Sequence, residues 1–146
     1  MAIRQANAEW KGTLKEGAGE MALGSGSYKG PFSFVSRFEN GSGTNPEELI
    51  GAAHAGCFSM ALAAALGRAG MTPTSIRTVA KVHLGTSDQG PTITRIDLEV
   101  EGDVPGIDQA TFQQQAEAAK KGCVVSRALG GVKEITLNAK LAEART

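Results

Sequence analysis

The chain has 146 residues, of which 41% are hydrophobic and 21% are charged, and fifteen basic side chains balance fifteen acidic ones. This size and composition are typical of one globular domain, 1–146, and the zero net charge argues against nucleic acid or an anionic membrane as a partner. No apolar h-region opens the sequence and no apolar run approaches the ~20 residues that cross a bilayer, so we expect a cytoplasmic protein.

The first third of the sequence predicts strands. Apolar residues alternate with polar ones over 8–23, which favours a hairpin that turns at Gly17–Gly19. Phe32, Phe34 and Phe38 then fall on one side of a further strand, and Arg37 falls on the other side.

The segment 46–69 carries the clearest helix signals. Asn45 suits the N-cap, Pro46 the first helical position and Glu48 a capping box, while Gly70 is a natural stop. Alanine and glycine dominate every side of this helix, so we expect it to be buried and closely packed. Its predicted inward face comprises Leu49, Ala53, Cys57, Met60 and Ala64.

The rest of the chain predicts a hairpin of strands 79–84 and 96–101, a helix from Asp108 to about Gly122, a short helix over 124–129, and a last strand, 135–141. The predicted fold class is therefore α+β, with antiparallel sheets packed around a central buried helix.

The two cysteines, Cys57 and Cys123, are either inert core residues or working thiols, since structural disulfides are rare in the cytosol. Their separation does not match the CxxC motif of thioredoxin-type exchange. With two separated histidines, they also do not match the spacings of a four-ligand metal site, so we expect no bound metal.

A working thiol must react as the thiolate, and a nearby fixed cation favours that form. Arg37 is the candidate cation because it interrupts a phenylalanine-rich segment. An inward arginine needs a carboxylate partner, which Glu47 or Glu48 would supply. The alternative is that Arg37 is a solvated strand residue.

The segment 44–62, TNPEELIGAAHAGCFSMAL, resembles the signature of the OsmC/Ohr family of organic hydroperoxide reductases, and its OsmC branch in particular. The similarity extends in order through most of the chain, to Arg37-Phe38-Glu39, Thr72-Pro73-Thr74-Ser75-Ile76, Val104-Pro105-Gly106-Ile107-Asp108 and Gly122-Cys123.

The resemblance implies a two-cysteine peroxidase. Cys57 would attack the peroxide and become a sulfenic acid, Cys123 would resolve it to a disulfide, and Arg37 with Glu47 would activate the thiolate. An external dithiol, such as a lipoylated protein, would reduce the disulfide without a bound metal or flavin. The resemblance also implies an intertwined homodimer with active sites at the subunit interface. One departure is Val124, where the family usually has proline.

Helix geometry restricts how these residues meet. Glu47 and Cys57 are about 15 Å apart along an unbroken helix and roughly 80° apart around it. Either the helix kinks near Gly51 or Gly56, or Glu47 acts from the other subunit of a dimer.

Other residues leave alternatives open. His54 is either packed within the helix or paired with Cys57 for acyl transfer, and His83 is expected to be exposed. A redox sensor that uses the same disulfide is a second functional class. A pocket for alkyl hydroperoxides, or simply the core, would include Phe32, Phe34, Phe58 and Met60.

Overall fold

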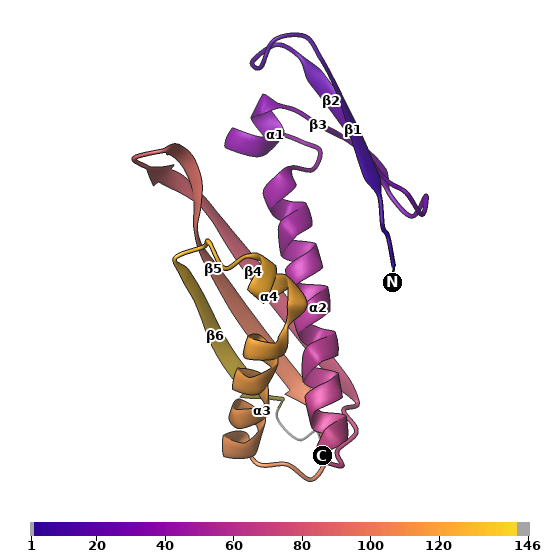
Figure 1. The fold of residues 1–146 in the computed structure, drawn as a ribbon, viewed down its shortest axis with the longest axis vertical. Helices are drawn as coiled ribbons and strands as arrows, with labels where there is room; N and C mark the ends of the chain where they lie inside the picture. Colours follow the sequence, from indigo (N-terminus) through magenta and orange to yellow (C-terminus); the bar gives the residue numbers. More distant parts are fainter. Residues whose placement is uncertain (1, 143–146) are drawn as a thin grey trace. The chain divides into compact units, whose positions relative to one another are not determined.

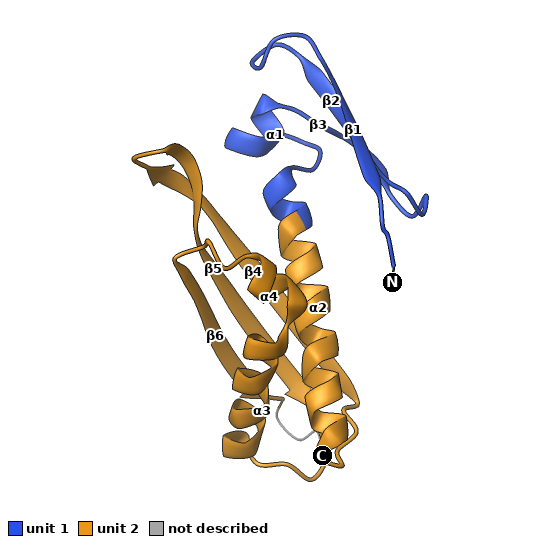
Figure 2. Ribbon diagram, in the orientation of Figure 1, with its two compact units in different colours: residues 1–49 blue, residues 50–146 orange. Residues whose placement is uncertain are grey.

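The computed structural model describes residues 2–142. The chain divides into two compact units with a boundary between Leu49 and Ile50 (Figure 2). Each unit has its own sheet (Figure 1).

The first unit contains an antiparallel sheet of strands β1 (Ala6–Lys11), β2 (Ala18–Leu23) and β3 (Lys29–Phe32), in that order. The predicted hairpin is present, but its turn lies at 12–17 rather than at Gly17–Gly19. Gly12 has a positive φ of 96°, which suits glycine at the start of the turn. Leu14, expected in the strand, lies in this turn and is exposed.

The prediction that one strand continues through Phe34 to Phe38 is wrong. β3 ends at Phe32, and Phe34–Phe38 form a short helix, α1. Ser33 and Ser36 make a reciprocal capping box, with each hydroxyl accepting a hydrogen bond from the other residue's backbone N–H, at 3.1 Å and 2.8 Å. These local bonds stabilise the helical turn.

The long helix α2 (Pro46–Arg68) begins and ends as predicted. The Asn45 side chain accepts from the Glu48 N–H at 2.8 Å, but the Glu48 carboxylate accepts from the Thr44 hydroxyl instead of closing the capping box on Asn45. At the other end Gly70 has a φ of 81°, and the N–H groups of Gly70 and Met71 bind back to the last turn in a Schellman arrangement.

The second unit contains a mixed sheet of β4 (Ser75–Ser87), β5 (Gly90–Asp103) and β6 (Glu134–Leu141). The hairpin of β4 and β5 is antiparallel, as predicted, but β6 is parallel to β5, which corrects the expectation of antiparallel sheets throughout. Two helices, α3 (Gln109–Gly122) and α4 (Val124–Ala128), connect β5 to β6. A connection of this length permits the parallel pairing.

The core of the second unit lies between this sheet and the helices α2 and α3 (Figure 1). Alternate residues of β5 point into it, and both helices contribute large apolar side chains to the same cluster. Its fully buried members include Phe58, Leu62, Leu66, Ile96, Leu98, Phe112 and Ala116.

The buried face of α2 is not the predicted one. Phe58, Leu62 and Leu66, at spacings of four, point into the core, whereas Ala53 is exposed and Met60 is 76% exposed. The large side chains therefore decide the orientation of a helix whose small residues give little contrast. The prediction that this helix is buried all round is therefore not met within this chain, because one side of α2 is exposed.

Among the described residues, α2 is the one helix that is long and apolar enough to cross a membrane, with a mean hydropathy of 1.7. The expectation that no apolar run approaches this length is therefore wrong. The core helix of a soluble protein meets the same test, and α2 inserts three large side chains into the core of its own unit.

Candidate active site

The two cysteines meet within the second unit. Cys57 lies on α2, Cys123 lies between α3 and α4, and their Sγ atoms are 3.2 Å apart as free thiols. Cys57 is partly exposed, whereas Cys123 is only 1% exposed. The fold thus brings together two thiols that are 66 residues apart in the sequence.

The junction of two helices fixes Cys123. Its backbone N–H donates to the Ala119 carbonyl at the end of α3, at 2.8 Å, and the residue then turns into an extended conformation, with ψ of 119°. It also serves as the N-cap of α4, where its sulfur accepts a hydrogen bond from the Ser126 N–H at 3.5 Å. Both neighbouring helices therefore restrict the sulfur's position.

Opposing effects act on the Cys123 thiol. Burial alone raises its pKa, but hydrogen bonds from the Ser126 hydroxyl and backbone N–H, with smaller contributions from Cys57 and Val125, outweigh burial and lower the pKa. The buried cysteine is therefore easier to ionise than an ordinary thiol.

A buried histidine adjoins this cluster. His54 lies on α2, is fully buried, and has its Nε2 2.6 Å from the Ser126 Oγ. Burial lowers its pKa, so the ring is neutral near pH 7. The sequence alone left open whether His54 was packed or paired with a cysteine, and the structure gives it Ser126 as its partner.

The charged pair lies in the first unit. Arg37 on α1 binds Glu47 at the start of α2 through Nε and Nη2, at 3.1 Å and 2.8 Å from Oε1. Glu47 is buried, while the Arg37 side chain is 39% exposed and stacks near the ring of Phe38. Of the two carboxylates that the sequence offered, Glu47 is the partner. The cysteine pair and this charged pair belong to different compact units.

Hydrogen bonds between α1 and the segment before α2 hold the charged pair in place. The Ser36 hydroxyl donates to the Thr44 carbonyl at 2.7 Å, and the Asn45 side-chain amide donates to the Ser36 carbonyl at 2.9 Å. Because Pro46 begins α2 immediately afterwards, Glu47 emerges in its first turn, facing α1. Of the alternative reading, a solvated strand residue, the strand is wrong because Arg37 lies in α1, whereas its side chain is paired with Glu47 and still 39% exposed.

The four predicted pocket residues lie in different places. Phe32 and Phe34 line a hollow of about 420 Å³ in the first unit, together with Trp10, Leu14, Ser33, Arg37 and Phe38. Phe58, in contrast, is fully buried in the core of the second unit. Met60 projects from the exposed side of α2.

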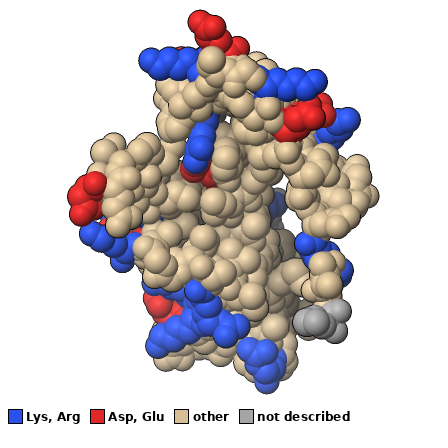
Figure 3. Space-filling view, turned by 45° about the horizontal axis from the view of Figure 1, so that its top comes forward, with Lys and Arg blue, Asp and Glu red and all other residues tan. Residues whose placement is uncertain are grey.

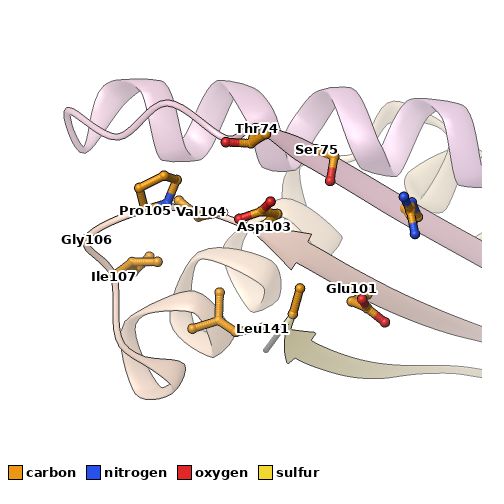
Figure 4. Close-up of a pocket in the computed structure, with 11 residues that line it drawn as sticks. Thr74, Ser75, Glu101, Asp103, Val104, Pro105, Gly106, Ile107 and Leu141 are labelled. Carbon is orange, nitrogen blue, oxygen red and sulfur yellow. The ribbon is translucent and has the colours of Figure 1, made fainter. Parts of the chain in front are cut away.

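A second hollow, of about 690 Å³, lies in the second unit where β4 begins and β5 ends (Figure 4). Thr74, Ser75 and Asp103 border it, together with the loop that leads into α3. None of the predicted site residues lines it. Among the described residues, no three His, Cys, Asp or Glu side chains gather as a metal site would require.

Charged side chains of both signs are scattered over the face drawn in Figure 3. On the outer side of the β4–β5–β6 sheet they pair across strands, as Lys81 does with Glu99 at 3.0 Å and His83 with Asp97 at 2.8 Å. His83 is exposed, as predicted.

Comparison with known proteins places this α+β scaffold and its thiol pair in a family. The model of the OsmC-like protein family matches residues 39–138. The chain is 51% identical to Peroxiredoxin OsmC of Escherichia coli over 139 residues, which cover 94% of this chain and 96% of that protein. It is 34% identical to the organic hydroperoxide resistance protein of Xanthomonas axonopodis over 98 residues, 66% of this chain and 67% of the relative. The chain therefore belongs to the OsmC-like family.

Solved structures share the fold. An OsmC-like protein from Mycoplasma pneumoniae superimposes with a TM-score of 0.75 at 15% identity, covering 97% of this chain and 99% of the other. An OsmC-like protein of unknown function from Vibrio cholerae gives 0.74 at 18% identity, covering 95% and 99%. At such low identity these likenesses establish the α+β fold alone.

Proposed function

We propose that this protein is a thiol-dependent peroxidase that reduces organic hydroperoxides to alcohols and so protects against oxidative stress. The observation that carries the proposal is the pair of free thiols, Cys57 and Cys123, with sulfurs 3.2 Å apart. The names of the relatives, Peroxiredoxin OsmC and organic hydroperoxide resistance protein, support a role of the peroxidase type.

In the first step Cys57 is the attacking residue, because it is the more exposed of the two thiols. The Cys57 thiolate attacks the terminal oxygen of the hydroperoxide and the O–O bond breaks. The thiolate becomes a sulfenic acid, and the alkoxide takes up a proton and leaves as the alcohol. Arg37 supports this step by favouring the thiolate, and Glu47 holds the guanidinium in a fixed orientation.

The second step forms the disulfide. The Cys123 sulfur attacks the sulfur of the sulfenic acid, an S–S bond forms, the S–O bond breaks, and water leaves. An external dithiol, of the dihydrolipoyl type carried by lipoylated proteins, then reduces the disulfide and becomes a disulfide itself. The cycle requires no bound cofactor.

An apolar substrate fits the surroundings of Arg37. The hollow beside it in the first unit is walled by aromatic side chains, including Phe32 and Phe34. Among residues 2–142 no acceptor binds Arg37 Nη1, so this nitrogen is available to a thiolate or a peroxide oxygen. Alkyl hydroperoxides match this combination of an apolar wall and a single cation better than hydrogen peroxide does.

A homodimer would bring the two groups together. α2 is continuous from Pro46 to Arg68, so Glu47 and Cys57 stand ten residues apart on one helix, about 15 Å along its axis. We propose that Arg37 and Glu47 of one subunit act on Cys57 of the other. The exposed small residues along α2 leave room for a second copy of the chain, at Ala52, Ala53, Gly56 and Ala64.

The test is turnover of cumene hydroperoxide with dihydrolipoamide as the reductant. We expect Cys57→Ser to abolish turnover, and Cys123→Ser to consume one equivalent of peroxide and leave a sulfenic acid that dimedone traps. If neither substitution changes turnover, the proposal is wrong. Slow consumption below one equivalent by the unmodified chain would instead favour a redox sensor that uses the same disulfide.

A further inference from the structure

His54 is a buried titratable residue to which the proposed peroxidase cycle gives no role. It is fully buried on α2, one turn before Cys57 and Phe58. Its Nε2 contacts the Ser126 Oγ at 2.6 Å, and its Nδ1 has no hydrogen-bond partner among the described residues. Ser126 in turn donates its backbone N–H to the Cys123 sulfur at 3.5 Å.

The unpartnered Nδ1 determines which group donates and which accepts in the hydrogen bonds from His54 through Ser126 to Cys123. The ring is neutral because burial lowers its pKa, so only one of its nitrogens carries a hydrogen. A hydrogen on Nδ1 would be a buried donor without an acceptor, which is rarer in proteins than an unfilled acceptor. The hydrogen therefore resides on Nε2 and is donated to the Ser126 Oγ.

This direction determines what Ser126 offers to the cysteine. Since the Ser126 oxygen accepts from His54, its own hydrogen is free to point elsewhere. The Cys123 sulfur, which already accepts from the Ser126 N–H at 3.5 Å, is the neighbouring acceptor toward which it can turn. A hydroxyl that donates to a sulfur stabilises the thiolate over the thiol.

We propose that His54 is a positioning residue that orients the Ser126 hydroxyl toward the Cys123 sulfur, and that this relay accelerates the resolving step alone. The inference rests on the proposed function. In the resolving step the Cys123 thiol loses its proton, the S–S bond forms, and the departing hydroxide of the Cys57 sulfenic acid combines with a proton to give water. The relay stabilises the Cys123 thiolate that forms once Cys57 carries the sulfenic acid, and the relay is not itself consumed.

A purely structural role for the same bonds has a different signature. The hydrogen bond between His54 and Ser126 also joins α2 to α4. If this role were purely structural, loss of the bond would destabilise the fold and slow the attack by Cys57 and the resolution by Cys123 equally. The relay predicts that the attack by Cys57 on the peroxide is unaffected, because neither Ser126 nor His54 has a hydrogen bond to the Cys57 sulfur among the described residues.

The test separates the two steps by rapid mixing of the reduced protein with one equivalent of cumene hydroperoxide. Peroxide consumption reports the first step, and the lifetime of the dimedone-reactive sulfenic acid reports the second. We expect Ser126→Ala to leave the first rate unchanged and to slow the second about tenfold, the effect of one hydrogen bond to a charged group.

Three further variants and a control sharpen the result. His54→Leu should slow resolution as much as Ser126→Ala, and His54→Gln, whose amide N–H can replace Nε2, should restore it. The double variant that combines His54→Leu with Ser126→Ala should resolve no more slowly than Ser126→Ala alone, because both residues act through one hydrogen bond. The control is Ser59→Ala, whose hydroxyl also bonds α2 to a neighbour, Thr78 at 2.7 Å, and which should leave both rates unchanged.

The outcomes distinguish the two proposals. If the unmodified chain completes both steps while Ser126→Ala resolves at the same rate, the relay is wrong and the peroxidase proposal stands. Equal slowing of both steps by Ser126→Ala also overturns the relay. If the unmodified chain forms neither sulfenic acid nor disulfide, the peroxidase proposal fails and the relay with it. In a Cys57→Ser background the ultraviolet absorbance of the Cys123 thiolate gives a second readout, and Ser126→Ala should shift its titration to higher pH.

Discussion

The surroundings of the two cysteines differ although their sulfurs are adjacent. Cys57 is carried on the side of a long helix and is partly exposed, so a peroxide can reach it. Cys123 is nearly inaccessible, and Ser126 lowers its pKa against the effect of burial. An accessible thiol suits attack on a substrate, and a buried, readily ionised thiol suits attack on its neighbour.

Val124 is the position where this chain departs from the proline usual in its family, and the structure accommodates that proline. Val124 is the first residue of α4, where the N–H lacks an intrahelical acceptor, and Cys123 before it is extended. We expect Val124→Pro to stabilise the reduced protein by about 0.5 kcal/mol by restricting the unfolded chain. Urea denaturation checks this, and a lower midpoint would show that the backbone here resists proline.

His54 makes stability depend on mild acid. Its pKa is lowered in the folded state, so below the ordinary value of about 6.5 the unfolded chain binds a proton that the folded chain does not. Stability should therefore fall as pH drops from about 6.5, with a slope of at most about 1.4 kcal/mol per pH unit from this residue. Urea midpoints between pH 7 and pH 5 measure it, and in His54→Gln the slope over this window should be smaller. An equal slope in both proteins would contradict the assignment.

The candidate site residues could be predicted from the sequence where their chemical type and their spacing both indicated a role. Cys57 and Cys123 are the only two cysteines, and Arg37 was recognisable as a charge among phenylalanines, although the choice between Glu47 and Glu48 needed the structure. The bond between His54 and Ser126 joins residues 72 positions apart, and no local pattern indicates it. A hint existed, because His54 lies four residues before Phe58 on the face that proves to be buried.

Among the elements, helix ends were more predictable than faces. The caps of α2 and α3 are local, so Asn45 with Gly70 and Asp108 with its bond from the Thr111 N–H were recoverable from the sequence. The face that α2 buries depends on what packs against it. The parallel pairing of β6 likewise depends on the connection through α3 and α4.

The helix α1 was mistaken for a strand because its phenylalanines fit two periods. Phe32 and Phe34 alternate as in a strand, whereas Phe34 and Phe38 are also spaced as neighbours on a helix, with ring centroids 5.0 Å apart. The serines at 33 and 36 decide the outcome, because their reciprocal caps favour the helical turn.

The contact between β5 and α3 depends on a missing side chain. A Cβ on Gly102 would lie 2.5 Å from the ring of Phe112, which is fully buried in the core. We expect Gly102→Ala to destabilise the protein by about 1–3 kcal/mol. Chemical denaturation measures the loss, with Gly122→Ala as the control, since a Cβ there meets nothing within 4 Å. A neutral Gly102→Ala would mean that α3 shifts freely on the sheet.

At the scale of the whole molecule, the charged pair and the thiol pair belong to different compact units. The family model matches from residue 39, inside the first unit, to residue 138, near the end of the second, so it includes Glu47 and both cysteines but begins after Arg37. Neither unit by itself therefore holds all the proposed catalytic groups, and the homodimer that we propose would supply them from two chains.

Mixing two inactive variants tests that assembly. If Arg37 of one subunit serves Cys57 of the other, an equimolar mixture of Arg37→Ala and Cys57→Ser, unfolded and refolded together, regains about a quarter of the original turnover. Half of the dimers would be mixed, and one of the two sites in each would be intact. Turnover of cumene hydroperoxide measures the recovery. A mixture as inactive as its components would place Arg37 and Cys57 of one chain in the same site.

The junction that holds Cys123 has one more consequence. A bond between Cys57 and Cys123 would turn the segment from the middle of α2 to the start of α4, with β4, β5 and α3 inside it, into a covalent ring. Closing a loop of this size lowers the entropy of the unfolded chain by the equivalent of about 4 kcal/mol. In each catalytic cycle the protein would then alternate between a disulfide form that resists unfolding and a less stable dithiol form. Exposure to peroxide would hold it in the more stable form until a reductant breaks the disulfide.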